Sequence, residues 1–211
     1  RCGKSVMMGL IQEELLSSGV DGSQIISINF ENMSNAPFCT AAALHDEIIR
    51  RTAGIKGKVY LFFDEIQEVE AWEKCINSFR VELDCDIYIT GSNAKLLSGE
   101  LATYLAGRYV EFVIYPFSFV EFVELYHTIR PEADTRQCFN RYLTLGGMPY
   151  LANLRYDETA SRQYLRDLFN SVELKDIVKR NNVRDVDMLE RIIAYVTANI
   201  VTVFSSTAIS K

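Results

Sequence analysis

The sequence lacks a hydrophobic run long enough to cross a membrane. Its longest candidate, residues 192–204, is interrupted by Thr197, Asn199 and Thr202. It is also shorter than the roughly 20 apolar residues that a membrane-spanning helix requires. We therefore expect no membrane partner for this chain.

Paired cysteines and clustered histidines are also missing. The five cysteines are odd in number, and none forms a C-x-x-C pair. The two histidines, His45 and His127, are isolated in the sequence. These absences argue against a disulfide framework and against a zinc site. They predict reduced thiols, which are typical of the cytoplasm, so we expect a cytoplasmic location.

Positively charged residues are fewer than negatively charged ones. Lys and Arg number 22 against 28 Asp and Glu, which gives a net charge of −6. This balance argues against a surface that binds nucleic acid all over, although it is compatible with a local basic patch. The apolar fraction, by contrast, is an ordinary 48%, which is enough for a hydrophobic core.

Helical and strand-like patterns alternate in the first half of the chain. Helical spacing of apolar residues predicts helices over 6–17, 41–51 and 71–83. Alternating or continuous apolar runs predict strands over 25–31, 59–63, 86–90 and 108–115. The run at 59–63 is apolar throughout, as in a strand that is buried on both faces of a parallel sheet. Strands separated by helices predict an open α/β sheet with βαβ crossovers.

The pattern changes after Pro116. From residue 118 to residue 204 the apolar spacing is almost entirely helical, so we expect a boundary near Pro116–Arg136. Gly146 and Gly147 interrupt the helical pattern shortly before Pro149. This interruption is compatible with a hinge and equally with a simple helix stop.

The chain opens on a phosphate-loop signature. Arg1, Cys2, Gly3, Lys4 and Ser5 match the end of the pattern G-x-x-x-x-G-K-[ST], known as Walker A. In that motif, backbone N–H groups at a helix N-terminus surround a phosphate. We expect Lys4 to reach the β- and γ-phosphates of ATP, and the Ser5 hydroxyl to bind Mg²⁺. A bare G-K-S triplet also arises by chance, so a second motif has to decide.

The second motif is VYLFFDE at residues 59–65. An apolar run ends there in two adjacent carboxylates, at the carboxyl edge of a strand, where α/β sheets bind ligands. As in a Walker B motif, Asp64 is expected to hold the Mg²⁺ shell and Glu65 to activate the attacking water. A buried strand followed by an acidic helix start is the alternative. The distance from the G-K-S triplet suits a βαβαβ unit and favours the pair of motifs.

The strand over 86–90 leads into the polar run Thr90-Gly91-Ser92-Asn93. A small polar side chain at this place can contact the γ-phosphate or orient the water, and the position is called sensor 1. Asn93 or Ser92 would occupy it. A turn built from good turn formers explains the same composition.

Together these motifs resemble one family, the prokaryotic AAA+ family ATPases that carry a C-terminal domain of unknown function. The resemblance covers nearly the whole chain. Its most specific runs are LFFDEIQ at 61–67, ITGSNAKLL at 89–97, LAGR at 105–108, PFSFVEF at 116–122 and GGMP at 146–149. Such proteins belong to the additional-strand-catalytic-Glu class of P-loop ATPases, with a sheet order of 5-1-4-3-2 or 2-3-1-4-5.

The resemblance implies a three-part organisation. It predicts a P-loop ATPase α/β core over 1–117, a helical lid over 118–180 and the start of a helical or winged-helix-like region over 181–211. A winged-helix-like region would leave room for a DNA or protein partner at the C-terminal end. The resemblance is also compatible with an oligomer.

Arg108 has two alternative roles. It can act as an arginine finger or an in-chain sensor, since a guanidinium neutralises charge on the leaving phosphate. It can equally form a structural ion pair with Glu100 or Glu111.

The function we expect is Mg²⁺-dependent ATP binding and hydrolysis, coupled to movement of the helical lid. The alternative is a nucleotide switch that regulates a protein or DNA partner without turnover. Glu65 favours the enzyme, a hydrolase, because a pure switch does not need a carboxylate that activates water.

A further expectation concerns the strand that leads into the phosphate loop. We expect it at the centre of the sheet, between the strand that ends at Asp64 and the strand that ends at Thr90. The sequence contains no such strand before Arg1. We therefore expect the natural protein to extend upstream, with an apolar strand and a glycine three places before Arg1. Without that strand the chain should bind ATP poorly, because a central gap leaves main-chain donors and acceptors unpaired.

Overall fold

The structure is a computed structural model that describes residues 2–91, 108–172 and 185–199. The chain divides into two compact units. The first unit comprises Arg1–Tyr142 and Gly146–Tyr150, and the second comprises Leu143–Leu145 and Leu151–Lys211. The domain boundaries expected from the sequence stay predictions.

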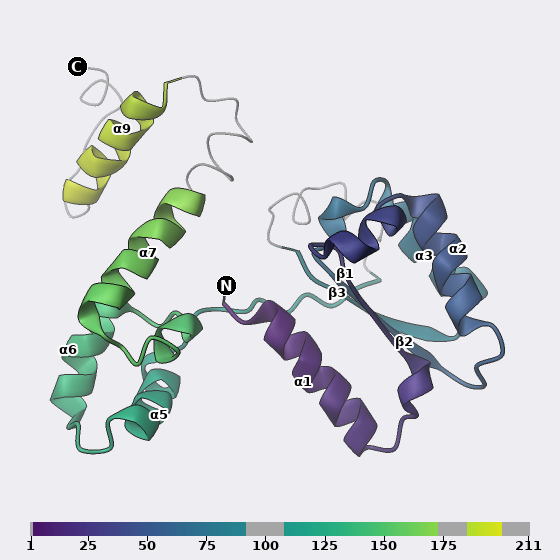
Figure 1. Cartoon of the computed structure of the whole chain (residues 1–211), viewed down its shortest axis with the longest axis horizontal. Coiled ribbons are helices and arrows are strands. Elements are labelled where there is room, and N and C mark those ends of the chain that lie inside the picture. Colours follow the sequence, from purple (N-terminus) through teal and green to yellow (C-terminus); the bar gives the residue numbers. More distant parts are fainter. Residues whose placement is uncertain (1, 92–107, 173–184, 200–211) are drawn as a thin grey trace. The chain divides into compact units, whose positions relative to one another are not determined.

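A three-stranded parallel sheet forms the centre of the first unit. Its elements are α1 (Lys4–Ser17), β1 (Ile25–Asn29), α2 (Ala41–Thr52), β2 (Val59–Asp64), α3 (Trp72–Glu82) and β3 (Cys85–Ile89). The connections contain the short 3-10 helices η1 (Gly22–Gln24), η2 (Met33–Phe38) and η3 (Ile66–Glu68). In Figure 1, α1 lies on one face of the sheet, and α2 and α3 lie on the other. The expected α/β architecture with a parallel sheet is confirmed.

The core of the first unit is built around β2. Leu61, Phe62 and Phe63 are fully buried, and neighbouring residues of a strand point to opposite faces. On one face, the Phe63 ring lies 6.1 Å from the ring of Phe79 in α3. The Phe62 ring stacks on Tyr88 of β3 at 4.6 Å. The strand is therefore buried on both faces, as its continuous apolar run predicts.

The order of the strands differs from our expectation. β2 and β3 pair directly, with Leu61 opposite Ile87 in a parallel register. Our expectation that the phosphate-loop strand lies between these two strands is therefore wrong. β2 uses its main-chain groups in ladders to β1 on one side and to β3 on the other, so no further strand fits beside it. Among the described residues, β1 and β3 form the edges of the sheet.

The expected strand over 108–115 is also not formed, because this segment contains no regular secondary structure. The large side chains of Val110, Phe112 and Tyr115 are 77%, 80% and 74% exposed. Alternation favours a strand only where a neighbour supplies hydrogen bonds and an apolar surface. None of the three described strands pairs with this segment, so within the described part of the chain the segment lacks the partner that a strand needs.

After Pro116 the described residues are mainly helical, as expected. α5 (Phe119–Ile129) and α6 (Thr135–Leu145) each begin with a capping box, which satisfies N–H groups of the first turn. Aromatic rings pack between the two helices, and the ring of Phe122 lies 5.3 Å from that of Tyr142. The two helices therefore form an antiparallel pair with its own small aromatic core.

At the base of this helix pair, the segment before α5 contacts the segment that follows α6. The Phe117 N–H donates to the Gly147 carbonyl at 2.8 Å, and the Tyr142 hydroxyl donates to the Phe117 carbonyl at 3.0 Å. A Cβ added at Gly147 would lie 2.0 Å from the Phe117 oxygen. α6 ends at Leu145, followed by Gly146 with a positive φ of 71°. This geometry is that of a helix stop in close contact with a neighbouring backbone, and a hinge at this place stays a prediction.

Glu47 of α2 is a nearly buried carboxylate that two arginines hold. Arg50 Nη2 and Arg51 Nε lie 2.9 Å and 2.6 Å from Glu47 Oε1, and the Glu47 side chain is 9% exposed. The hydrogen bonds from these arginines lower the pKa of Glu47 from its usual 4.5 to about 2. A carboxylate with a lowered pKa stabilises the fold above its unfolded pKa. That contribution is lost as the pH falls through the folded pKa.

We expect Glu47→Gln to remove this contribution. The variant should be less stable than the parent at pH 7. Between about pH 4.5 and pH 2 it should lose less of its remaining stability. Thermal unfolding followed by circular dichroism across this range tests the prediction. Glu158→Gln is the control, because the ion pair of Glu158 with Arg162 is exposed and should contribute little. Parallel acid profiles of parent and Glu47→Gln would contradict the prediction.

The second unit is helical in its described part. It contains the second half of η4 (Pro149–Ala152), then α7 (Glu158–Val172) and α9 (Val186–Ala198). The Asp185 carboxylate caps α9 by accepting a hydrogen bond from the Met188 N–H at 2.8 Å. Residues 200–211 lie outside the described residues, so the start of a winged-helix-like region stays a prediction.

Candidate functional site at the carboxyl edge of the sheet

Asp64, the last residue of β2, is held from both sides by its neighbouring strands. Asn29 at the end of β1 donates from its side-chain nitrogen to Asp64 Oδ2 at 3.0 Å. The Thr90 hydroxyl, just after β3, donates to Asp64 Oδ1. Asp64 is 8% exposed, and a buried carboxylate requires such donors. The sheet thus presents one oriented carboxylate at its carboxyl edge.

Thr90 also contacts the next acidic residue. The Glu65 N–H donates to the Thr90 hydroxyl oxygen at 3.3 Å, and the Ile66 N–H donates to the Thr90 carbonyl at 3.0 Å. Glu65 has a left-handed backbone with a φ of 56°, so the chain turns sharply as it leaves the strand. One threonine therefore contacts the side chain of Asp64 and the backbone of Glu65.

The predicted phosphate-loop residues lie at the N-terminus of α1. The helix begins at Lys4, preceded by Gly3 with a φ of 100°, and no side chain caps its first turn. A positive φ of this size favours glycine. Cys2 and Lys4 are half-buried and Ser5 is exposed. The first N–H groups of the helix therefore have no side-chain acceptor from the N-cap residue.

α1 places this N-terminus at the same end of the unit as the acidic residues. α1 and β1 run in opposite directions (Figure 1), and Gln12 of α1 donates to the Ser27 hydroxyl of β1 at 3.4 Å. The first turn of α1 consequently lies toward the carboxyl ends of the strands. This is the end at which open α/β sheets bind their ligands.

Three of the remaining predicted site residues fall outside the part of the chain that the structure describes, and the fourth is exposed. Arg1, Ser92 and Asn93 lie outside the described residues. Arg108 is exposed at the start of its segment and forms no ion pair with Glu111 within the part of the chain that the structure describes. The structure thus brings Asp64 and Glu65 into contact with the same threonine, and the roles of all the predicted site residues stay predictions.

Two residues of the site were missed by the sequence interpretation. Asn29 and Thr90 both contact Asp64, yet only Ser92 and Asn93 were considered for the end of the third strand. The signal was present, because β1 and β2 each end in a polar residue and Thr90 directly follows the last residue of β3. Parallel strands bring such residues to one edge of the sheet.

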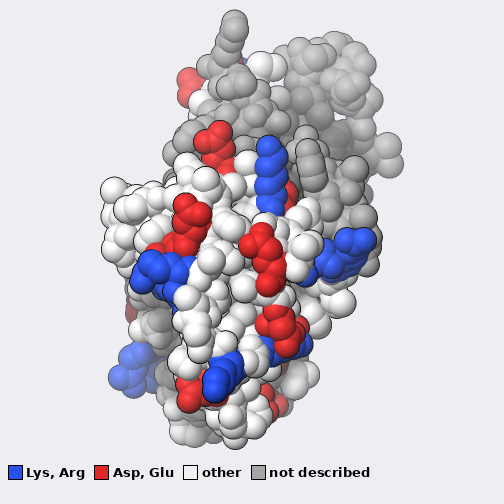
Figure 2. All heavy atoms as spheres, turned by 90° about the vertical axis from the view of Figure 1, so that its right-hand side faces the viewer, with Lys and Arg blue, Asp and Glu red and all other residues white. Residues whose placement is uncertain are grey.

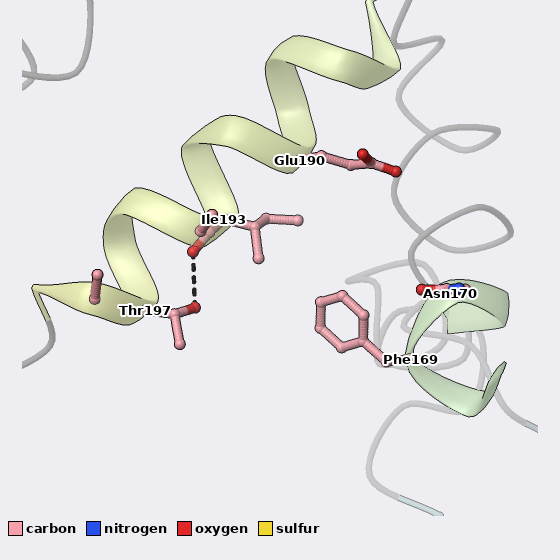
Figure 3. A pocket seen from close by; sticks show the side chains of 7 residues that line it. Phe169, Asn170, Glu190, Ile193 and Thr197 are labelled. Atoms are coloured by element: carbon pink, nitrogen blue, oxygen red, sulfur yellow. Dashed lines mark hydrogen bonds between the residues drawn. The ribbon is translucent and has the colours of Figure 1, made fainter. Parts of the chain in front are cut away.

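A hollow of about 580 Å³ lies in the second unit between α7 and α9 (Figure 3). Phe169 and Asn170 line it from α7, and Glu190, Ile193 and Thr197 line it from α9. The Thr197 hydroxyl already donates to the Ile193 carbonyl at 2.7 Å. The hollow contains none of the predicted site residues, so it gives no support to nucleotide binding.

The surface on the side of the sheet that carries α2 and α3 has a mixed charge. Figure 2 shows acidic and basic side chains interspersed across this face. Some of the charges in the first unit are paired, as in the ion pair of Lys58 with Asp86 at 3.0 Å. Charges of both signs cancel at a distance. The visible described residues therefore offer no basic stripe for a nucleic acid.

The family comparison agrees with the geometry of the strand edge. Residues 1–123 match the model of a family described as an AAA domain. The chain belongs to the AAA domain family. Residues 136–211 match a second model, described as a domain of unknown function. The resemblance to AAA+ ATPases is thereby confirmed at the level of the AAA family, while the additional-strand-catalytic-Glu class stays a prediction.

Relatives of this AAA domain chain are uncharacterised. An uncharacterised protein of Haemophilus influenzae is 36% identical over 211 residues, which is 100% of this chain and 52% of the relative. An uncharacterised protein of Methanocaldococcus jannaschii is 31% identical over 169 residues, which is 75% of this chain and 38% of the relative. The chain thus spans about half or less of the length of these relatives. No solved structure matches it.

Membership of the AAA family indicates a nucleotide-binding, ATPase-type domain. No described helix is long and apolar enough to cross a membrane. The geometry and the family match together define the candidate site of this AAA domain. It consists of the N-terminus of α1 and the edge formed by Asn29, Asp64, Glu65 and Thr90.

Proposed function

We propose that this AAA domain binds ATP together with Mg²⁺ and hydrolyses it. The observation that carries the proposal is the contact of Thr90 with Asp64 and with the Glu65 backbone at the carboxyl edge of the sheet. A buried strand that ends in two oriented acidic residues suits the two tasks of holding a metal ion and activating water. Family membership supports nucleotide binding.

In this proposal Arg1, Cys2, Gly3, Lys4 and Ser5 form the phosphate-binding loop. The left-handed Gly3 and the uncapped first turn of α1 support it. Backbone N–H groups at a helix N-terminus bind phosphate because they are unpaired donors in a positive local field. The Lys4 ammonium adds a mobile positive charge for the β- and γ-phosphates.

Asp64 and Ser5 are the residues that would hold Mg²⁺. Carboxylate and hydroxyl oxygens are the ligands that this ion prefers. Within the described ranges, no group of three or more His, Cys, Asp or Glu residues forms a metal cage. A single carboxylate fits an ion that is shared with substrate phosphates. When bound, Mg²⁺ supplies positive charge that neutralises the phosphate oxygens.

Glu65 is the proposed general base. Its carboxylate accepts a proton from the water that attacks the γ-phosphorus of ATP. Asn93 would orient that water or contact the γ-phosphate, and Arg108 would neutralise charge on the leaving phosphate. These last two roles rest on the sequence alone. Glu65 also favours turnover over a nucleotide switch that does not hydrolyse ATP.

Phosphate release by the intact protein is the experiment that tests the proposal. With ATP and Mg²⁺ we expect steady release of inorganic phosphate, and we expect none after the metal is chelated. Nucleotide binding without any phosphate release would favour the switch. The absence of both binding and release would refute the proposal.

We expect Lys4→Ala to abolish measurable ATP binding. The substitution removes the mobile cation of the phosphate loop, and losing one partner of a close charge pair weakens binding by roughly 100-fold or more. Calorimetric titration of ATP into the intact protein measures the effect. Lys56→Ala is the matched control, because it removes the same charge from an exposed position before β2. An unchanged affinity in Lys4→Ala would remove this residue from the site.

Movement of the helical region 118–180 and a protein or DNA partner at the C-terminal end complete the proposal. The movement is suggested by the change of pattern after Pro116, and the partner by the resemblance to AAA+ ATPases. A cytoplasmic location is supported by the five cysteines, all of which are free thiols. The proposal is compatible with an oligomer.

A further inference from the structure

The turn after β2 brings a glutamine amide onto the proposed general base. Gln67 Nε2 donates a hydrogen bond to Glu65 Oε2. Glu65 precedes η3 with a φ of 56°, so the chain turns back within two residues. This turn lets the Gln67 amide reach the Glu65 carboxylate, and both residues are half-buried.

The backbone that carries Gln67 is held in place on both sides. The Ile66 N–H donates to the Thr90 carbonyl at 3.0 Å, and the Glu68 N–H donates to the Glu65 carbonyl at 3.1 Å. Ile66 and the following Val69 are buried in the core of the first unit. A side chain on such a turn has little freedom, so the Gln67 amide approaches Glu65 from a defined direction.

The oxygen atom of the Gln67 amide does not stabilise the fold through a hydrogen bond among the described residues. Its Oε1 atom is buried and accepts no hydrogen bond from that part of the chain. A buried acceptor without a donor costs free energy, and an apolar side chain of similar size would fill the space without this cost. The bond to Glu65 is the contact that accounts for an amide at this position.

We infer that Gln67 is a positioning residue for Glu65, an inference that rests on the proposed function. The amide uses one of the acceptor positions of the carboxylate, which has about four, and holds its orientation. Glu65 then accepts the proton of the attacking water. The water oxygen bonds to the γ-phosphorus, the bond from that phosphorus to the bridging oxygen breaks, and ADP leaves with the electron pair.

Gln67→Met tests this inference, because it removes the amide and keeps the length of the side chain. We expect kcat for ATP to fall about 10- to 100-fold, as is typical when a reacting group is misplaced. KM and the affinity for ATP should stay unchanged. Gln163→Met is the matched control. It removes a Gln amide bond to a carboxylate on α7, where Gln163 donates to Asp167 at 2.9 Å, and it should leave kcat unchanged.

A double-mutant cycle shows whether Gln67 acts through Glu65. In a Glu65→Gln background, single-turnover rates should not fall further when Gln67→Met is added, because the group that Gln67 positions is already lost. A purely structural effect would instead lower the rate by the same factor in both backgrounds, and that result would overturn the inference. Gln67→Leu, which also removes the amide without adding a charge, provides the same measurement if Gln67→Met does not fold.

The outcomes separate the inference from the proposed function. A parent protein without ATP turnover would refute the proposed function, and the inference would fall with it. A parent that hydrolyses ATP, combined with an equal or higher kcat in Gln67→Met, would overturn the inference alone.

Discussion

Replacing Glu65 with glutamine is expected to leave ATP binding intact and to lower turnover by about 10²- to 10⁴-fold, the usual contribution of a general base. An amide has nearly the shape of a carboxylate but cannot accept a proton from water. The Glu65 N–H contact with Thr90 involves the backbone, so the substitution should not disturb it. Phosphate release under saturating ATP, together with calorimetric binding, measures both parts of the prediction.

Glu68→Gln is the matched control for this experiment. Glu68 belongs to the same η3 turn, but it is exposed. The Glu68→Gln variant should therefore hydrolyse ATP at the parent rate. Parent-like turnover in Glu65→Gln would assign the base to another residue, whereas loss of binding would mean that Glu65 contributes to the nucleotide site itself.

Gly147→Ala is expected to destabilise the first unit by about 3 kcal/mol, at the upper end of typical overpacking costs. The added Cβ would lie 2.0 Å from the Phe117 oxygen and 2.9 Å from its carbonyl carbon. These are backbone atoms, so no rotamer change relieves the clash. The two segments have to separate, which breaks the hydrogen bond from Phe117 to Gly147. Chemical denaturation of the intact protein measures the loss.

Gly9→Ala provides a control of opposite sign. Gly9 lies inside α1, and a Cβ added there meets no atom within 4 Å. Alanine stabilises a helix interior by about 0.5–1 kcal/mol relative to glycine. If Gly147→Ala were as stable as the parent, the close contact with Phe117 would not exist in solution.

Local features of the core were predictable because they depend on the chain's own pattern. The continuous apolar run before Asp64 predicts a strand buried on both faces, and Phe62 and Phe63 are both fully buried. The helix predicted over 6–17 from its apolar spacing is present as α1, although it begins two residues earlier, at Lys4. These predictions need no knowledge of which segments become neighbours in space.

The features that failed depend on neighbours. Nothing in the apolar run of β2 states that its partner is β3, so the strand order was predicted wrongly. Residues 108–115 alternate like a strand, but alternation does not specify a hydrogen-bonding partner. The contact of Asn29 with Asp64 depends on the register that places these two residues opposite each other. A register is a property of two strands and is not visible in either one.

The contact between Phe117 and Gly147 also affects how the chain tolerates changes of length. Because the two backbones touch, the chain departs after Phe117 and comes back to almost the same point at Gly147. Residues added or removed in the exposed turn near Pro131 would lengthen or shorten this excursion without redirecting the chain on either side. Over evolutionary time, insertions and deletions should therefore accumulate at that turn rather than at the two ends that meet.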